Sequence, residues 1–219
     1  CWGAGGSGQT TVPSLSNPTQ ISTGDNTACA LDDSGVQCWG DNDYDQITVP
    51  SLSNPTQISA SWVHTCALDD SGVNCWGENS FGQATVPSLS NPTQVSTGDY
   101  HTCVIDDSGV QCWGGNNNGQ TTVPSLSNPT QISAGGYHTC ALDDSGVQCW
   151  GGNDYDQTTV PSLSNPSQID AGGYHFCAID DSGVKCWGGN PNGQTDVPSG
   201  LSFSNISSGS SSGSGSSSG

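Results

Sequence analysis

The sequence has almost no positive charge, no methionine and no long hydrophobic run. Its 219 residues contain one Lys or Arg, Lys185, against 20 acidic residues, for a formal net charge of −19. A nucleic-acid backbone is bound by several cations that release counterions, so we exclude nucleic acid as a partner. An anionic membrane surface is excluded for the same reason, and no apolar segment approaches the roughly 20 residues that a membrane-inserted helix needs.

Long runs of helix-forming residues are also missing. The chain contains 31 glycines and 12 prolines, and 31% of its residues are hydrophobic. Every apolar stretch is short and is bounded by Gly, Pro, Asn or Asp, which is typical of β-strands joined by turns. The sequence therefore predicts an all-β fold.

A 37-residue period dominates what is present. Its clearest mark is a pair of cysteines separated by eight residues. The pairs are Cys29 and Cys38, Cys66 and Cys75, Cys103 and Cys112, Cys140 and Cys149, and Cys177 and Cys186. Residues 1–22 match the second half of such a unit, and residues 201–209 match the start of another. Repeats this similar indicate that each unit occupies an equivalent environment.

Each cysteine pair is predicted to close its own β-hairpin. In the fourth repeat, a two-residue turn at Asp144-Ser145 places Cys140 opposite Cys149. Directly opposed residues have Cβ atoms about 4.5–5.5 Å apart, which is near disulfide reach. Zinc sites use shorter Cys-x2–4-Cys spacings, so the alternative of metal ligands is disfavoured. We expect five disulfides and therefore an oxidising compartment, extracellular or at the cell surface.

Each unit contains four short predicted strands, the last of them at the Thr-Val-Pro segment. A four-stranded unit of about 40 residues is typical of a propeller blade. The sequence predicts a β-propeller of 37-residue four-stranded blades, six in number, with the last blade closed by both termini. An open or seven-bladed array is the alternative. Residues 1–209 would form the propeller, and residues 210–219 a Ser/Gly-rich tail or linker.

One set of recurring positions carries a family resemblance. In the fourth repeat these are Gly135, His138, Leu142, Gly146, Trp150, Gly151, Asn153 and Gln157. The pattern resembles the regulator-of-chromosome-condensation repeat family, which implies a β-propeller, usually of seven blades. The paired cysteines resemble the secreted bacterial branch of that family, and the period is similar to that of the secreted β-lactamase-inhibitory propeller. Among the family's functions, protein binding by one propeller face fits the charge and the cysteines best.

Four aromatic residues beside the Gly-rich turns are the candidate binding residues. They are Trp62, Tyr100, Tyr137 and Tyr174. Aromatics on one face suit contacts with proteins or sugars, whereas packing residues are the competing interpretation. The predicted partner is a protein, a glycan or another copy of the chain. Asn205 begins the only usable N-glycosylation sequon.

No unique set of nucleophile, base and orienting acid occurs in the sequence, so we predict a non-enzymatic protein without cofactors. The histidines at one repeat position are assigned to hydrogen bonds within the turn. The loop Asp41–Asp45 has alternating carboxylates but lacks the glycine and glutamate of a calcium loop, so no metal site is predicted. The predicted function is partner binding through one face. The alternative is a structural subunit of an extracellular fibre or surface layer.

Overall fold

The protein is described by a computed structural model that covers residues 5–199. These residues form fifteen β-strands and no helix, and hence no helix that could cross a membrane. The strands are β1 (Gln20–Thr23), β2 (Thr27–Asp32), β3 (Gly35–Gly40), β4 (Gln57–Ala60), β5 (His64–Asp69), β6 (Gly72–Gly77), β7 (Gln94–Thr97), β8 (His101–Asp106), β9 (Gly109–Gly114), β10 (Gln131–Ala134), β11 (His138–Asp143), β12 (Gly146–Gly151), β13 (Gln168–Ala171), β14 (His175–Asp180) and β15 (Gly183–Gly188). Each repeat contributes three consecutive strands to one antiparallel sheet, so the all-β prediction is confirmed.

The hairpin register agrees with the sequence prediction. In the fourth sheet Cys140 pairs with Cys149 and Asp143 pairs with Gly146, which leaves residues 144–145 as the turn. The backbone of Gly146 has a φ of 105°, which only glycine adopts readily. The turn therefore needs a glycine at this position in every repeat.

All five predicted disulfides are present. In each hairpin the Cα atoms of the two cysteines lie 4.0 or 4.1 Å apart. Each bridge closes a short ring across β-strands that are already paired. In the loop-entropy account, closing a ring of this size contributes roughly 2–3 kcal/mol to stability.

The expected fourth strand of each unit is absent among the described residues. In the first interval, Val49 donates its backbone N–H to the carbonyl of Ile47 two residues earlier (3.0 Å), and Pro50 has no N–H. This segment therefore has too few free donors to extend a sheet. Val49 and Leu52 instead pack against the cluster between the first and second sheets. The four-stranded blade was a wrong prediction, because the hydrophobic pattern records packing and not strand pairing.

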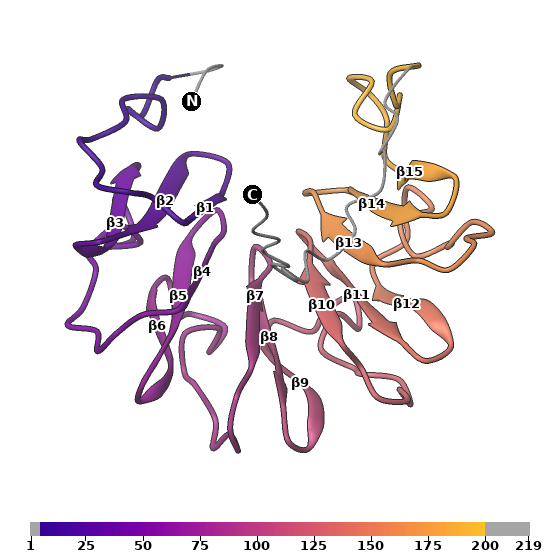
Figure 1. Cartoon of the computed structure of the whole chain (residues 1–219), viewed down its shortest axis with the longest axis horizontal. Helices are drawn as coiled ribbons and strands as arrows, with labels where there is room; N and C mark the ends of the chain where they lie inside the picture. Colours follow the sequence, from indigo (N-terminus) through magenta and orange to yellow (C-terminus); the bar gives the residue numbers. More distant parts are fainter. Residues whose placement is uncertain (1–4, 200–219) are drawn as a thin grey trace, which may run out of the picture.

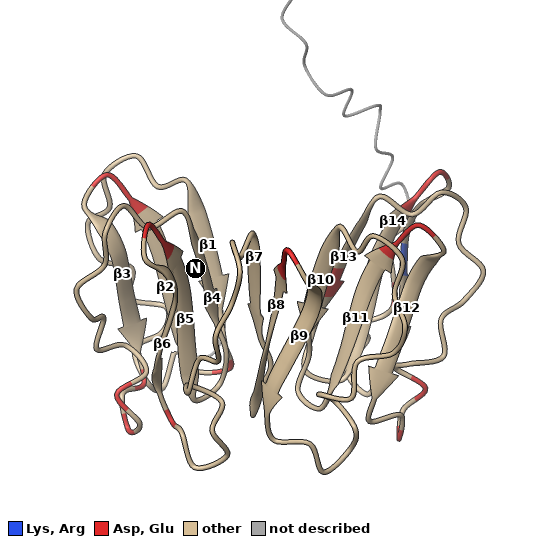
Figure 2. Cartoon of the chain, turned by 90° about the horizontal axis from the view of Figure 1, so that it is seen from below, with Lys and Arg blue, Asp and Glu red and all other residues tan. Residues whose placement is uncertain are grey.

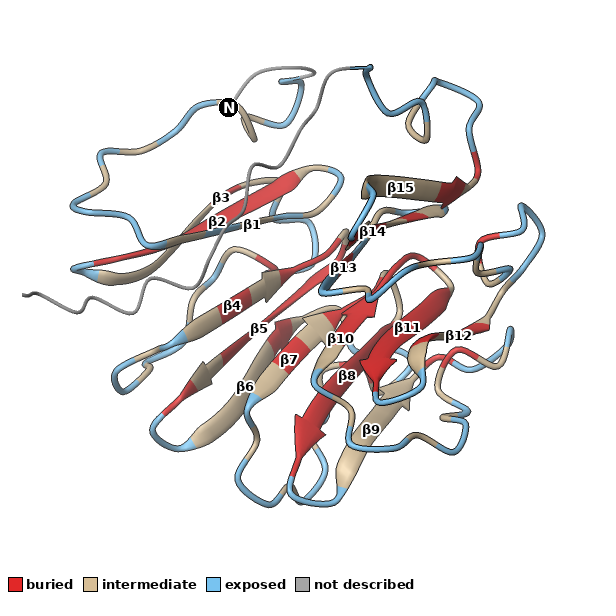
Figure 3. Cartoon of the chain, turned by 45° about the vertical axis from the view of Figure 1, so that its right-hand side comes forward, coloured by how far each residue is buried: buried red, intermediate tan, exposed pale blue. Residues whose placement is uncertain are grey.

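The five sheets stand side by side in an arc, with the first strand of each sheet on the inside (Figure 1). The middle strands are the most buried (Figure 3). Apolar clusters lie between successive sheets: Cys29 and Leu31 of the first sheet pack with Ile58 and Trp76 of the second. Each hairpin thus has a forward face with the disulfide and a backward face with the tryptophan.

Several predictions concern residues outside the described range. The sixth blade closed by both termini, the tail at residues 210–219 and the sequon at Asn205 all depend on residues 1–4 and 200–219. The described part contains five sheets, and the total number of blades stays a prediction.

Candidate binding site on the aromatic face

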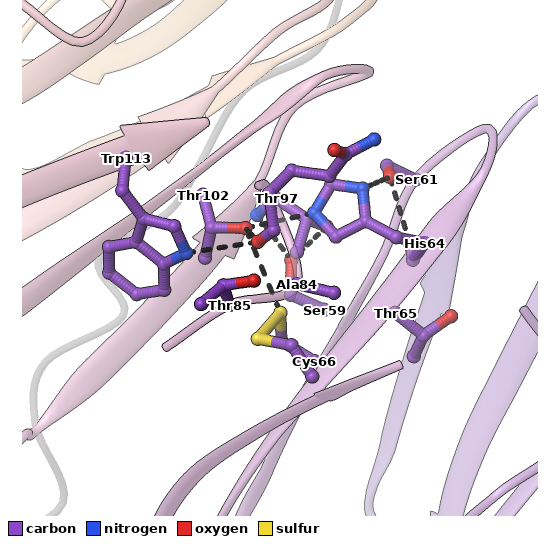
Figure 4. The surroundings of a disulfide bond; sticks show 12 residues. Ser59, Ser61, His64, Thr65, Cys66, Ala84, Thr85, Thr97, Thr102 and Trp113 are labelled. Carbon is purple, nitrogen blue, oxygen red and sulfur yellow. Dashed lines mark hydrogen bonds between the residues drawn. A yellow bond between two sulfur atoms is a disulfide. The ribbon is translucent and has the colours of Figure 1, made fainter. Parts of the chain in front are cut away.

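Two of the four recurring histidines, His64 and His101, belong to the scaffold that holds the aromatic residues in place. His64 lies at hydrogen-bond distance from Ser61 Oγ (Nδ1, 3.1 Å) and from Thr102 Oγ1 of the next sheet (Nε2, 2.9 Å), as Figure 4 shows. His101 contacts Thr139 in the same way at 2.8 Å. The bond within the turn was predicted for these histidines, and it occurs at His64. The bond to the next sheet was missed.

Burial keeps these imidazoles neutral. It lowers the pKa of His64 and of His101 to about 3. A neutral, fully buried and hydrogen-bonded imidazole cannot exchange protons with a substrate at neutral pH. His64 and His101 therefore join sheets and are not placed to carry protons.

The recurring tryptophans and glutamines position the outer loops. Trp76 is buried and donates its indole N–H to the carbonyl of Gln46 (3.0 Å). The side chain of Gln46 is also buried, and its Oε1 accepts the backbone N–H of Tyr44 (2.9 Å). Equivalent glutamines hold Phe81 (3.0 Å) and Tyr155 (2.8 Å). The loop after the third strand of a sheet is thus fixed so that an aromatic side chain stands outward.

The four predicted binding aromatics lie next to one another in space. The ring centroids are 5.9 Å apart for Trp62 and Tyr100, 5.6 Å for Tyr100 and Tyr137, and 6.4 Å for Tyr137 and Tyr174. Three of these side chains are half-buried, and Tyr174 is 46% exposed. They come from four consecutive repeats, so the arrangement depends on the sheets standing side by side.

Sequence reasoning missed two further members of this group. The ring of Phe81 lies 5.4 Å from that of Tyr100, and the ring of Tyr155 lies 5.4 Å from that of Tyr174. Both are about half exposed. Their common position two residues before the buried glutamine was the available signal. The following residues are called the aromatic arc: Trp62, Phe81, Tyr100, Tyr137, Tyr155 and Tyr174.

Backbone contacts hold the arc in place. The carbonyl of Tyr137 accepts the N–H of Gly152 (2.8 Å), and the carbonyl of Tyr100 accepts the N–H of Gly115 (2.7 Å). A Cβ atom added at Gly152 would lie 3.2 Å from the Tyr137 carbonyl oxygen, so this close approach favours glycine. Tyr137 is therefore tied to the loop that carries Tyr155.

Tyr100 and Tyr174 are uncharged at neutral pH. Burial, with a smaller contribution from Tyr137, raises the pKa of Tyr100 to about 12. Burial also raises the pKa of Tyr174, and Asp99 and Asp25 add to that shift. These two carboxylates therefore act on the tyrosines from the inner side of the arc.

Carboxylates surround the arc. The loops that follow β3, β6 and β12 carry acidic residues at one end of the sheets, and the Asp-Asp turns lie at the other end (Figure 2). The acidic residues of these three loops are Asp41, Asp43, Asp45, Glu78, Asp154 and Asp156. Lys185, the one Lys or Arg of the sequence, forms an ion pair with Asp180 (2.9 Å), next to the turn at the opposite end. The aromatic face is therefore acidic, with no lysine or arginine to balance it.

A central cavity of about 410 Å³ lies between the first strands and the turns after them. Side chains bridge these strands from sheet to sheet. Gln94 donates to the carbonyl of Ile132 (3.1 Å) and accepts that residue's N–H (2.9 Å), while Ser96 Oγ accepts the N–H of Ala134 (2.9 Å). This Gln-x-Ser bridge recurs between successive sheets. It supplies hydrogen-bond partners to the first strand of each sheet, which is an edge strand with no neighbouring strand on that side.

Asp99 lines the cavity together with Asp25. Burial first, and then repulsion from Asp25, raise the pKa of Asp99 to about 6. Within residues 5–199 no group of three or more His, Cys, Asp or Glu side chains is arranged to hold a metal ion. In the loop Asp41–Asp45, which has the alternating carboxylates of a calcium loop, the side chain of Asp41 accepts the backbone N–H of Asp43 (3.2 Å).

The repeats match a known family. A family model described as the regulator of chromosome condensation (RCC1) repeat matches residues 19–46, 56–83, 93–120, 130–157 and 167–194. Each match spans one three-stranded sheet and the loop up to the buried glutamine position, and together the matches cover well over half of the chain. The chain belongs to the RCC1 repeat family. A comparison with curated protein sequences finds no match.

Solved structures share the fold. The ectodomain of the Physcomitrella patens receptor kinase CR4 has a TM-score of 0.68 at 26% identity, over 79% of this chain and 52% of that chain. The CRINKLY WD40 ectodomain of the Arabidopsis thaliana receptor kinase ACR4 has a TM-score of 0.63 at 27% identity, over 77% and 65%. Prp20p of Saccharomyces cerevisiae has a TM-score of 0.66 at 18% identity, over 78% and 57%, a likeness of fold alone. The chain spans about half to two thirds of the length of these neighbours.

Proposed function

We propose that this chain is a non-enzymatic, extracellular RCC1-repeat protein that binds a protein or glycan partner through the aromatic arc. The observation that carries the proposal is the contiguity of the arc. Neighbouring rings from four consecutive repeats have centroids between 5.6 and 6.4 Å apart and are partly exposed. Exposed, adjoining aromatics of this kind are typical of the centres of binding surfaces.

The rest of the molecule supports a binding role. Two of the recurring histidines, His64 and His101, are engaged in bonds that join sheets, and the recurring tryptophans and glutamines brace the loops. Their repetition indicates a scaffold, whereas the outer position of the arc differs between repeats. Phe81 and Tyr155 stand where other repeats have Asn118 and Asn192, and all four residues are exposed. Variation at exposed positions on a repeated scaffold is what recognition of a specific partner requires.

An extracellular location is supported by two findings. The protein has five disulfides. Disulfides persist in oxidising compartments and are rare in the cytosol. The similar plant structures are ectodomains of receptor kinases. The resemblance of the paired cysteines to the secreted bacterial branch of the family is in accord with this location.

A structural role in a fibre or surface layer is the second candidate, and the last sheet favours it. Its forward face, which the next sheet covers in the others, leaves Cys177 and Ile179 partly exposed among the described residues. We infer that either the sixth blade from both termini or a second copy covers this face. A purified protein that stays monomeric at high concentration in light scattering excludes the second copy.

The binding proposal is tested by comparing the wild-type protein with a triple variant, Tyr100→Ala, Tyr137→Ala and Tyr174→Ala. Both are applied to an oligosaccharide array and to a panel of immobilised peptides of basic, acidic and neutral composition. We expect at least one probe that the wild type binds and the variant loses, with circular dichroism unchanged. If wild type and variant bind the same probes equally, the arc is not the binding surface.

A further inference from the structure

We propose that the aromatic arc recognises a cationic, extended protein segment in which lysine or arginine alternates with small residues. The inference rests on the proposed function and specifies the chemistry of its partner. Three features of the described residues carry it: the ring spacing, the distribution of carboxylates, and the shortage of cations.

The spacing of the rings fits an extended chain. Alternate side chains on one side of a β-strand are about 6.6 Å apart. The centroid distances along the arc are 5.6 Å from Tyr100 to Tyr137 and 6.4 Å from Tyr137 to Tyr174. The rings of the second pair lie at an interplanar angle of 30°, so their faces are nearly parallel. Successive rings can therefore meet every second side chain of a bound strand.

Neutral tyrosine rings attract cations through their faces. Ammonium and guanidinium groups bind within about 6 Å of a ring centroid. The raised pKa values of Tyr100 and Tyr174 keep both hydroxyls protonated well above neutral pH. Half-burial of Tyr100 and Tyr137 holds each ring in one orientation, which lowers the entropy cost of binding.

The carboxylates lie on both sides of the arc. Asp25 and Asp99 act on Tyr174 from the side of the central cavity. Asp154 and Asp156 are exposed and flank Tyr155 on the outer side. Since Lys185 is bound to Asp180 near the opposite end of the sheets, neither Lys nor Arg neutralises this face. A positively charged segment is steered to it, and an anionic one is repelled.

The experiment measures fluorescence anisotropy of a labelled peptide of alternating lysine and serine. A length-matched peptide of alternating glutamate and serine serves as the probe control. The peptides are titrated with wild-type protein and with two double variants, Tyr137→Ala with Tyr174→Ala, and Asp154→Asn with Asp156→Asn. A charge-matched control carries Asp33→Asn and Asp70→Asn in the turns at the opposite end, where an asparagine keeps an oxygen for the bonds from Asn17 and Asn54.

We expect the lysine peptide to bind and the glutamate peptide not to bind. The tyrosine variant should weaken binding by about tenfold. The Asp154/Asp156 variant should weaken it several-fold, whereas the Asp33/Asp70 variant should bind as the wild type does. Added sodium chloride should weaken binding by the wild type. Melting curves of the two aspartate variants should overlay that of the wild type, and the tyrosine variant should still unfold cooperatively, with a melting temperature only slightly lowered.

Two results overturn the inference. One is equal loss of affinity in the two aspartate variants, since that indicates attraction to the overall charge. The other is no binding of the lysine peptide, or binding that the tyrosine variant retains. If a neutral peptide or an oligosaccharide then binds in a manner that depends on Tyr137 and Tyr174, the cationic partner is wrong and the proposed binding function stands. If no probe depends on these tyrosines, both are wrong.

Discussion

The inner sheets and the last sheet contain nearly the same sequence in different surroundings. His64, His101 and His138 are fully buried, whereas His175, at the same repeat position, is partly exposed. Burial lowers the pKa of the first two to about 3 and that of His138 to about 4. The pKa of His175 is lowered as well, by burial that Asp170 opposes. One sequence position thus has different properties according to whether a following sheet covers it.

The last sheet also differs in composition. Phe176 replaces the threonine whose hydroxyl is hydrogen-bonded to a histidine of the preceding sheet at Thr102 and Thr139, and its ring centroid lies 4.8 Å from that of His138. Asp170 replaces the serine of the Gln-x-Ser bridge, and burial raises the pKa of its carboxyl group. Phe176 faces the fourth sheet and packs against it, whereas Asp170 stands at the position from which the inner sheets bridge to the sheet that follows them.

This comparison indicates that each sheet is stabilised by contacts with the sheets on either side of it. In stacked repeats, the total is approximately a sum of the stability of each unit and of the contacts between adjacent units. A substitution on a forward face should therefore cost more in an inner sheet than in the last one. The following predictions test that difference.

Acid should destabilise the inner sheets most. In the unfolded chain the histidines have a pKa near 6.5, so as the pH falls they bind protons before the buried histidines of the folded protein do. Each buried histidine therefore lowers the free energy of unfolding by about 1–2 kcal/mol between pH 6.5 and pH 5. The carboxyl group of Asp99, whose pKa is raised to about 6, takes up a proton in the folded protein over the same range. This uptake stabilises the folded state and offsets part of the loss. The carboxyls of Asp69 and Asp106 have lowered pKa values and stay ionised in both states above pH 5.

Urea unfolding at several pH values measures this effect. The variant His101→Thr, which copies Thr27 of the first repeat, should show a shallower loss of stability with acid than the wild type. The matched variant His175→Thr should change the pH dependence less. Equal effects of the two variants would contradict the proposed difference between inner and last sheets.

Removal of one disulfide should come next in size. Replacement of Cys103 and Cys112 by alanine is expected to lower the free energy of unfolding by about 2–3 kcal/mol through loop entropy. Replacement of Cys177 and Cys186 should cost about 1 kcal/mol less, because Cys103 is fully buried and Cys177 is not. Chemical denaturation of the two double variants measures both values, and a larger loss from the last pair would reverse the expected order.

The glutamine bridge should have a smaller effect. Gln94→Ala leaves the backbone N–H and carbonyl of Ile132 without their side-chain partner, which costs about 1–3 kcal/mol. Gln168 is exposed, so Gln168→Ala should change stability by less than about 0.5 kcal/mol. Melting temperatures of the two variants give the comparison. A substantial loss in Gln168→Ala would show that this edge is covered as the inner ones are.

The smallest effect on stability is expected in the aromatic arc. Tyr155 is 53% exposed and contacts Tyr174 edge-on, so Tyr155→Ala should lower the unfolding free energy by no more than about 1 kcal/mol. The same change should weaken binding of the lysine peptide. A loss as large as that of a disulfide would place Tyr155 in the core and remove it from the binding surface.

Much of the local structure could be predicted from the sequence. The hairpin register, the turn at residues 144–145 and the disulfide between Cys140 and Cys149 follow from local spacing and turn chemistry. The family membership follows from the resemblance of the recurring Gly, His, Trp and Gln positions to the family pattern. The proximity of Trp62, Tyr100, Tyr137 and Tyr174 follows from the 37-residue period, because equivalent residues of stacked repeats lie side by side. The fourth strand was predicted wrongly because the valine of the Thr-Val-Pro segment packs against the cluster between two sheets and does not belong to a paired strand.

Contacts between sheets were harder to foresee. The bonds from His64 to Thr102 and from Gln94 to Ile132 join residues 38 positions apart. These bonds depend on how one sheet is placed against the next, and this placement cannot be predicted from a local sequence pattern. The recurrence of Gln-x-Ser and of His-Thr-Cys in successive repeats was the available signal, since polar residues kept at buried positions indicate hydrogen-bond partners.

An NMR pH titration of the four histidine side chains tests most directly whether consecutive sheets cover one another. The structure predicts that the imidazole shifts of His64, His101 and His138 stay constant from pH 8 to about pH 5, while His175 titrates at a higher pH than these three. Four histidines that titrate together near the unperturbed value of about 6.5 would contradict the stacked arrangement of the sheets.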